Sequence, residues 1–424
     1  MLRVLLDLRP TEPGFKAHAG RGTGRYTSEL SARLLRLAEG DPSIEIIGLK
    51  SSMVERPAWE ERVVNLLPAG KRTFESQVLY PNRVAAVGAD IVHFFSHGDA
   101  PARAVVPQIV TVLDLIPLRF PDLYRADKPN LRFQFARWME HQAIRCSTGV
   151  LAISEATKRD CVELLGLRAE DIVVTPLAVS DQLLRSAAYE ASRRDLIALQ
   201  RGRLGLPQDR PLLLYIGGID PRKNVLFLLD VFADVLAQWR PDTPRPLLLL
   251  GGAYEQDDQY PKLVARQRAL GLQEHVRLLG YVPDDSLAAL YQSADLFLFP
   301  SLYEGFGLPV LEALACGTPV VAGDNSSLPE VVGGAGMLLA DNDQRLWVTT
   351  VLELLSAPEE LTRLSDVGIR RARLFSWERT SEATLAAYHH FAATASSAGG
   401  KVRAEAAGEV PQHGHGPTKQ ASRG

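Results

Sequence analysis

Short apolar runs alternate along most of this chain with longer segments of helical periodicity. This alternation is typical of repeated strand–helix–strand units, because parallel strands need a crossover segment between them. It therefore predicts an α/β fold built on parallel sheets. With 424 residues the chain exceeds the size at which one hydrophobic core stops growing, so we expect two domains.

The short apolar runs predict six strands in each half of the chain. Those of the first half are expected at 3–8, 44–49, 90–94, 108–112, 149–153 and 172–175. Those of the second half are expected at 212–215, 246–250, 276–280, 296–300, 319–322 and 336–339. Helical periodicity marks 23–37, 129–145 and 224–239.

Composition along the chain suggests the domain boundaries. Residues 180–200 are polar and predict no strand, so we place the linker there. The expected units are residues 1–185, residues 204–376, a final helix at 377–395 and a tail at 396–424. The tail carries Gly, Ala and His without periodicity, and we expect it to be disordered.

Charge and cysteine content narrow the class of protein. The net charge of −3 does not favour a nucleic-acid-binding protein, which would present a strongly basic face. No apolar run reaches the roughly 18 residues of a membrane-spanning helix, and the apolar start is too short for a signal peptide. Three cysteines without a C-x-x-C pair indicate a reducing compartment, so we expect a cytoplasmic protein. No histidine spacing indicates a metal site.

The segment 301–317 carries the strongest functional signal. It follows the expected strand 296–300, and Pro309 suits the first turn of a helix that Gly317 ends. Gly305 and Gly307 let the loop backbone approach a ligand closely. The helix start offers free N–H groups to phosphates or sugar hydroxyls.

Two glutamates bracket this loop, Glu304 before it and Glu312 in the helix. Carboxylates accept hydrogen bonds from vicinal hydroxyls, so this pair can bind the diol of a sugar or a ribose. Two glutamates at this spacing are by themselves more often solvated surface charges. The Gly-Phe-Gly-Leu-Pro string between them favours a functional role.

A second strand-to-helix turn carries Gly217 and Gly218, followed by Arg222 and Lys223. Two cations beside a helix start suit a diphosphate. In a parallel sheet such turns lie at the same edge, so this turn and the 301–317 loop can converge on one ligand.

These motifs resemble glycosyltransferase family 4. The match covers about residues 1–393 and is more specific in the second half. The family's E-x7-E motif is matched by Glu304 and Glu312, and its donor-phosphate signature is similar to 217–224. Weaker matches are the acceptor-side glycine loop at 22–26, the strand region 110–118, the hinge-side serine motif at 153–155, and the strings 318–321 and 328–330.

The resemblance implies a GT-B fold, in which two Rossmann-like domains face a central cleft and a C-terminal helix crosses back to the first domain. It implies a retaining transfer from a nucleoside diphosphate sugar, with hinge closure and without a catalytic metal or other cofactor.

The resemblance also implies roles for individual residues of the second half. Arg222 and Lys223 would stabilise the leaving diphosphate, which is the main electrostatic task. Glu304 would hold the transferred sugar and Glu312 the ribose. Gly217 and Gly218 belong to the donor-phosphate signature, and backbone N–H groups would come from Phe306, Gly307 and Leu308.

In the first half, Asp114 would face the reacting centre from the acceptor side, and Gly22 would belong to the acceptor loop. Asp114 could equally cap a turn, and Gly22 could serve a plain turn. Two positions depart from the family pattern. Leu113 stands where a histidine often contacts the donor sugar, and Gly218 stands where many members carry an arginine, a charge that Arg222 would supply instead.

The favoured hypothesis is a hexosyltransferase that resembles bacterial mannosyltransferases of surface-polysaccharide biosynthesis. It would use GDP-mannose and a polysaccharide or lipid-linked acceptor. Aromatic and basic residues in 129–145 fit ordinary domain packing better than peripheral contact with the inner face of a membrane. The alternative is a catalytically silent scaffold that binds a partner glycosyltransferase. A nicotinamide dehydrogenase is excluded, because no true G-x-G-x-x-G follows the first strand.

Overall fold

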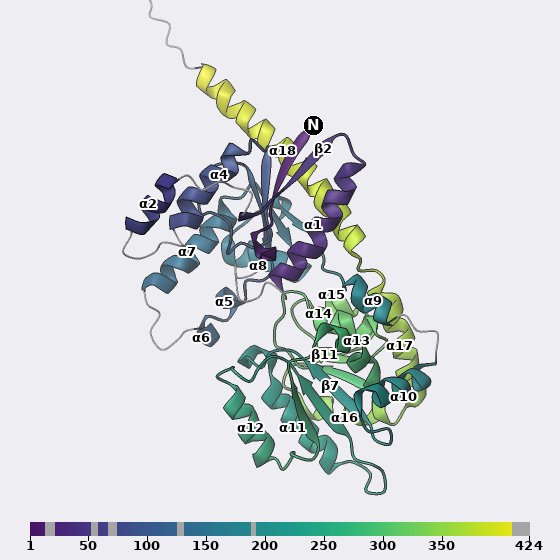
Figure 1. Ribbon diagram of the computed structural model, residues 1–424. Coiled ribbons are helices and arrows are strands. Elements are labelled where there is room, and N and C mark those ends of the chain that lie inside the picture. Colours follow the sequence, from purple (N-terminus) through teal and green to yellow (C-terminus); the bar gives the residue numbers. More distant parts are fainter. Residues whose placement is uncertain (13–21, 52–57, 67–73, 125–130, 188–191, 409–424) are drawn as a thin grey trace, which may run out of the picture.

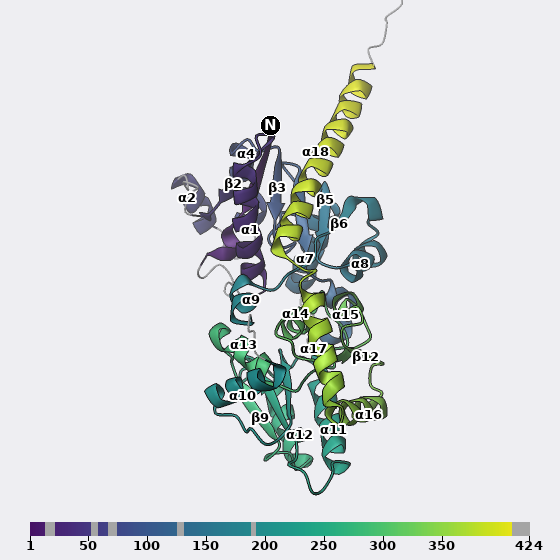
Figure 2. The same ribbon diagram turned by 90° about the vertical axis from the view of Figure 1, so that its right-hand side faces the viewer.

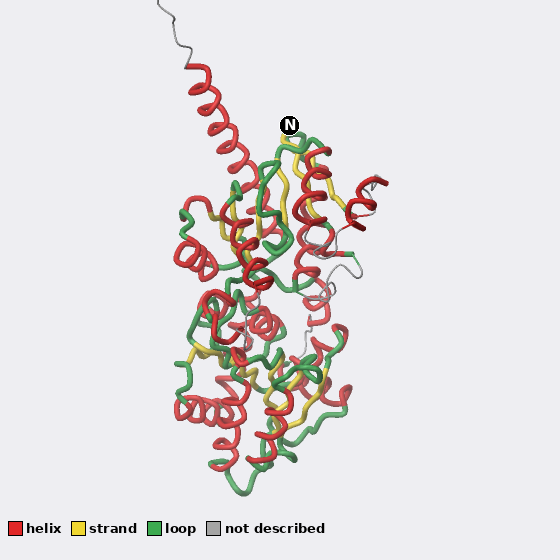
Figure 3. The backbone as a smooth tube through the Cα atoms, turned by 90° about the vertical axis from the view of Figure 1, so that its left-hand side faces the viewer, coloured by secondary structure: helices red, strands yellow, loops and turns green. Residues whose placement is uncertain are grey.

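The computed structural model describes residues 1–12, 22–51, 58–66, 74–124, 131–187 and 192–408. It forms two lobes, each with strands at its centre and helices around them (Figures 1 and 3). This confirms the expected two-domain α/β fold with parallel sheets.

The first lobe is built on a six-stranded parallel sheet of order β2-β1-β3-β4-β5-β6. Its strands are β1 Leu2–Asp7, β2 Ile44–Leu49, β3 Ile91–Phe94, β4 Gln108–Val112, β5 Gly149–Ala152 and β6 Ile172–Val174. Its helices are α1 Thr23–Glu39, α2 Ala58–Leu66, α4 Tyr80–Ala86, α5 Ile116–Arg119, α6 Pro121–Tyr124, α7 Leu131–Arg145 and α8 Glu155–Leu165.

The second lobe is built on a six-stranded parallel sheet of order β12-β11-β10-β7-β8-β9. Its strands are β7 Leu212–Ile216, β8 Leu247–Gly251, β9 Val276–Gly280, β10 Leu296–Phe299, β11 Val320–Gly323 and β12 Met337–Leu339. The remaining helices are α9 Asp181–Ala187, α10 Arg193–Leu204, α11 Val225–Ala237, α12 Tyr260–Ala269, α13 Asp284–Ser293, α14 Leu308–Ala315, α15 Leu328–Val332, α16 Gln344–Leu355, α17 Pro358–Ala372 and α18 Trp377–Gly408.

The central strands of both sheets are buried on both faces. Every residue of β4, β8 and β10 is buried, and the sequences of β8 and β10 are almost wholly apolar. This is the pattern expected of parallel strands that are covered by helices on both sides. The strands expected from the sequence are present, with small differences at their ends.

The segment 180–200, in which no strand was expected, contains α9 and most of α10. Helix α10 packs on α13 of the second lobe, where Gln200 Nε2 lies 3.0 Å from Gln292 Oε1. Arg201 donates to the backbone carbonyl of Ser293 and forms an ion pair with Asp295 at 2.6 Å. The chain therefore enters the second lobe before the expected start at residue 204.

Helix α18 crosses back along the first lobe, beside α1, and projects beyond the first sheet (Figure 2). Tyr388 and Phe391 are buried in the core of the first lobe. The tail was expected to be disordered from residue 396, but the helix continues to Gly408. Its added residues include Ala, Lys, Arg and Glu, which are good helix formers. The rest of the tail lies outside the described residues.

The aromatic residues of α7 do not all pack into the domain as expected. Phe135 and Trp138 are 54% and 52% exposed. Their rings stack on each other with centroids 5.7 Å apart. Part of the expected helix 129–145 lies outside the described residues. Among the described helices, none is long and apolar enough to cross a membrane.

Candidate functional site

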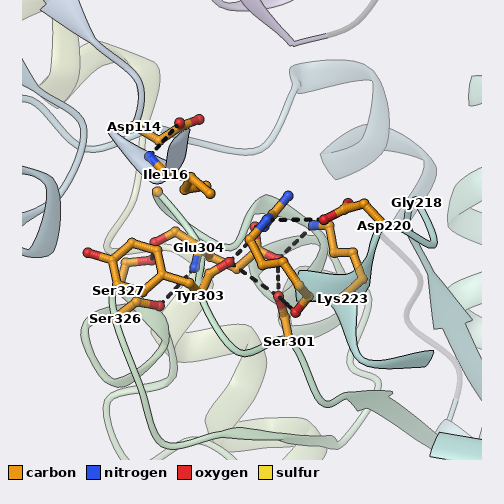
Figure 4. Close-up of polar contacts among 12 residues, drawn as sticks. Asp114, Ile116, Gly218, Asp220, Lys223, Ser301, Tyr303, Glu304, Ser326 and Ser327 are labelled. Carbon is orange, nitrogen blue, oxygen red and sulfur yellow. Dashed lines mark hydrogen bonds and ion pairs between the residues drawn. The ribbon is translucent and has the colours of Figure 1, made fainter. Parts of the chain in front are cut away.

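The two turns that the sequence singled out meet at the edge of the second sheet. Lys223 Nζ lies 2.6 Å from Glu304 Oε1, and Arg222 Nη1 lies 3.0 Å from Glu304 Oε2 (Figure 4). The turns converge because β7 and β10 are paired parallel neighbours, so both turns leave the sheet at the same edge.

Local backbone structure places the two cations. After β7 the chain forms a single 3₁₀ turn over Pro221–Lys223, which ends at Asn224 in the left-handed conformation with φ 57°. The guanidinium of Arg222 also donates to the carbonyl oxygen of Tyr303 at 2.6 Å. The first turn is thereby joined to the loop that carries Glu304.

The charges around Glu304 keep it ionised although it is only 7% exposed. Burial by itself raises the pKa of this carboxyl. The positive charges of Lys223 and Arg222 outweigh burial, together with hydrogen bonds from Lys223 and Ser301, and the pKa lies below its usual range. Glu304 is therefore a hydrogen-bond acceptor here, rather than a proton donor.

The loop after Glu304 leads into a short helix as expected. Gly307 precedes α14 with φ 97°, a conformation that favours glycine. A Cβ atom added there would also lie 2.7 Å from a methyl group of Leu328. Phe306 is buried and packs edge-on against Phe375, and Leu308 is the first residue of the helix.

Glu312 lies inside α14 and is 6% exposed. Its Oε2 accepts a hydrogen bond from the hydroxyl of Tyr291 at 3.0 Å. Burial, together with the charge of Glu312, raises the pKa of Tyr291 well above its usual range, so the hydroxyl remains a donor.

The two glycines of the first turn differ in the space around them. A Cβ added at Gly217 would lie 2.7 Å from the hydroxyl oxygen of Tyr215, whose hydroxyl donates to the carbonyl of Gly218 at 2.5 Å. A Cβ at Gly218 would make only an ordinary contact with Asp220 at 3.6 Å. Position 218 therefore has room for a side chain.

The first lobe contributes Asp114 to the same region. A Cβ added at Gly305 would lie 2.2 Å from the carbonyl oxygen of Leu113 and 3.0 Å from Cβ of Asp114, so the two loops touch across the lobes. Burial raises the pKa of Asp114, although the hydrogen bond from Ile116 N–H and the charge of Arg222 act in the opposite direction.

Gly22 precedes α1 with φ 61°. The beginning of α1 lies at the boundary between the lobes, because Arg25 donates to Ser180 Oγ at 2.6 Å and lies 3.8 Å from Asp284 of α13. The structure thus brings together Arg222, Lys223, Glu304 and Asp114. Gly22 lies at the start of α1 and Glu312 inside α14, where its carboxylate is held by Tyr291.

Sequence reasoning missed several polar residues around Glu304. Ser301 Oγ donates to Glu304 Oε1 at 2.6 Å, and the hydroxyl of Tyr303 donates to Asp160 of α8. Ser326 Oγ accepts from the backbone N–H of Glu304 at 2.9 Å. Ser301 and Tyr303 lie within the segment that was singled out, but no local pattern points to Ser326 or Asp160.

No group of three His, Cys, Asp or Glu side chains that could hold a metal ion is found within the described part of the chain. The absence of a metal requirement stays a prediction.

Family models match both halves of the chain. Residues 20–183 match "Glycosyltransferase Family 4", and residues 197–371 match "Glycosyl transferases group 1". The chain is 32% identical to O-antigen chain mannosyltransferase B of Escherichia coli, over 87% of this chain and 95% of that protein. It is 31% identical to a D-inositol 3-phosphate glycosyltransferase of Thermobispora bispora, over 80% of each.

Solved structures with the same fold are more distant in sequence. Sucrose-phosphate synthase from Thermosynechococcus elongatus gives a TM-score of 0.66 at 19% identity, with 93% of this chain and all of that chain covered. WaaG, a glycosyltransferase involved in lipopolysaccharide biosynthesis, gives 0.63 at 18% identity, with 91% of this chain and 98% of that chain covered. The chain belongs to glycosyltransferase family 4, and it is an enzyme of that family with the GT-B fold.

Proposed function

We propose that the chain transfers a hexose, with mannose as the best candidate, from a nucleoside diphosphate sugar to a polysaccharide or lipid-linked acceptor with retention of configuration. Two similar proteins of Escherichia coli support this choice of sugar. They are O-antigen chain mannosyltransferase B and the serotype-specific mannosyltransferase WbdA.

The observation that carries the proposal is the largely buried cluster of Lys223, Arg222 and Glu304. When the sugar–phosphate bond breaks, negative charge builds up on the departing diphosphate. Two fixed cations in a poorly solvated site stabilise that charge more strongly than water does. The sugar would lie beside Glu304, whose ionised oxygens accept hydrogen bonds from hydroxyl groups.

Other residues fit the remaining parts of the donor and acceptor. Glu312 would accept hydrogen bonds from the ribose, with its carboxylate held by Tyr291. The N–H groups of Phe306, Gly307 and Leu308, near the start of α14, would face the sugar and phosphate. Asp114 would take up the proton of the attacking hydroxyl, because its raised pKa makes it a better proton acceptor.

A thermal-shift screen against GDP, UDP, ADP and TDP, each with and without magnesium, tests the donor assignment. A ligand at 100 times its dissociation constant stabilises the protein by about 2.7 kcal/mol, which such a screen detects. We expect GDP to give the largest shift, with or without magnesium, and Lys223→Ala or Glu312→Ala to abolish it. If none of the four nucleotides raises the melting temperature, the silent-scaffold alternative is favoured.

A further inference from the structure

The beginning of α8 in the first lobe touches the loop that carries Glu304 in the second. Ser154 precedes the helix, and its Oγ accepts the N–H of Thr157 at 2.9 Å. The same Oγ donates to the carbonyl oxygen of Gly305 at 2.7 Å, and Thr157 Oγ1 donates to that oxygen at 3.2 Å. One backbone carbonyl next to Glu304 is therefore held by two side chains of the opposite lobe.

A carboxylate of the second lobe completes the N-terminus of α8. Glu330 accepts the N–H of Glu155 through Oε2 and the N–H of Ala156 through Oε1, both at 2.7 Å. The first N–H groups of a helix have no partner within the helix and attract negative charge. Here the cap is supplied from α15 of the other lobe, so this contact forms only when the lobes are in this arrangement.

A third contact lies one turn further along α8. The hydroxyl of Tyr303 donates to Asp160, which is buried at 3% exposure. Tyr303 and Gly305 are the two neighbours of Glu304 in the chain, and both contact α8. On its other side, the backbone of Glu304 is held by the hydroxyls of Ser326 and Ser327, at 2.9 and 3.0 Å.

From these contacts we propose that the N-terminal turns of α8 position Glu304 for transfer, with Ser154, Asp160 and Glu330 as positioning residues. The inference rests on the proposed function, in which Glu304 holds the transferred sugar. Approach of the two lobes would fix the backbone on both sides of Glu304 and bring it into its reactive place. Residues that bind the nucleoside, such as Glu312, lie outside this contact and would not depend on it.

Two substitutions in the full-length protein test the inference. Glu330→Gln and Asp160→Asn keep the size of each side chain but remove its negative charge. Both should lower kcat by about 10- to 100-fold, because a displacement of about 1 Å at a reacting group has costs of this order. The dissociation constant for GDP should change less than about twofold, since a tenfold change would require about 1.4 kcal/mol of lost contacts.

The matched control is Glu163→Gln on the same helix, whose exposed carboxylate forms an ion pair with Arg119 of the same lobe at 3.0 Å. It should leave both constants unchanged. Tyr303→Phe provides a milder second variant, because it removes a single hydroxyl. Combined with Asp160→Asn it should add little further loss, since both changes remove the same hydrogen bond.

Hydrogen exchange separates this inference from the proposed function, because it needs no turnover. Amides of residues 303–307 should exchange faster in Glu330→Gln and Asp160→Asn, whereas those of residues 217–224 should not. Unchanged exchange at 303–307 in both variants, or an unchanged kcat in both, would overturn the positioning role. If the unaltered protein neither binds a nucleotide nor turns over, the proposed function is refuted instead. The exchange result would then still show whether α8 holds residues 303–307 in place.

Discussion

Lys223 and Glu304 lie 81 residues apart in the chain, yet their charged atoms are 2.6 Å apart and both side chains are largely buried. The pair holds the turn after β7 against the loop after β10. The pair fixes the relative position of the two turns, and in the proposed function it also presents a cation and a carboxylate to the donor. The two purposes can be separated by measuring stability and activity on the same variants.

Lys223→Ala leaves the carboxylate of Glu304 with Arg222 as its remaining cationic partner. Removing one partner of a largely buried ion pair leaves the other charge less well compensated. We therefore expect a loss of about 2 kcal/mol in the free energy of unfolding. Urea unfolding measures this loss. The control Lys262→Ala removes an exposed lysine of α12 and should cost almost nothing. Equal stabilities of the two variants would contradict a structural role for the pair.

Glu304→Gln should show a pH-dependent effect on stability. The pKa of Glu304 is lowered in the folded protein, so the unfolded chain binds its proton first as the pH falls. The stability that the charge contributes is complete above about pH 5.5 and is lost as the pH falls through the lowered pKa. Urea unfolding at pH 7, 5 and 4 measures the free energy of unfolding of the unaltered protein and of Glu304→Gln. The difference between these two free energies should become smaller as the pH falls. A difference that stays constant to pH 4 would argue against an ionised Glu304.

His93 should make the first lobe sensitive to mild acid. It is buried, its Nδ1 lies 2.7 Å from the hydroxyl of Tyr388, and burial lowers its pKa to about 3. The unfolded chain takes up a proton near pH 6.5 while the folded chain does not, so stability falls below that pH. The slope is up to about 1.4 kcal/mol per pH unit.

Urea unfolding at pH 7 and pH 5 measures this slope for the unaltered protein, His93→Gln and the control His389→Gln. His93→Gln should be destabilised at pH 7 but should show a smaller loss between the two values. His389 is exposed on α18, and its replacement should leave the slope as it is. The same slope in all three proteins would contradict the buried neutral state of His93.

Gly305→Ala should impair activity more than folding. Its Cβ would lie 2.2 Å from the carbonyl oxygen of Leu113, a backbone atom of the other lobe. The lobes can relieve this clash by moving apart, which would separate Asp114 from Glu304. We expect kcat to fall by about 100-fold, with the melting temperature reduced by only a few degrees.

The matched control for this substitution is Gly202→Ala in α10, where the added Cβ would meet only the side-chain amide of Gln208 at 3.9 Å. It should retain normal activity and gain slightly in stability, because alanine favours the helix. Normal activity of Gly305→Ala would show that the close approach of the two lobes is not needed for transfer.

The sequence was sufficient for those parts of the site that depend on local pattern. Strands β7 and β10 are apolar and are followed by glycine-bearing turns, so the convergence of Lys223 and Glu304 follows from parallel topology alone. Contacts between distant polar residues carry no such pattern. The pair Arg201–Asp295 draws α10 onto the second lobe, and Tyr303–Asp160 joins the two lobes. Neither of these two contacts could be predicted from a single amino-acid sequence.

The central claim is that Lys223 and Glu304 serve a nucleotide-sugar transferase site, and nucleotide release tests it most directly. The protein is incubated with an oligomannoside acceptor and, separately, GDP-mannose, UDP-glucose or ADP-glucose, while free nucleoside diphosphate is measured. We predict that GDP-mannose gives the fastest acceptor-dependent release, and that Lys223→Ala slows it by about 100-fold or more. Equal release by Lys223→Ala, or no release from any donor, would contradict the account.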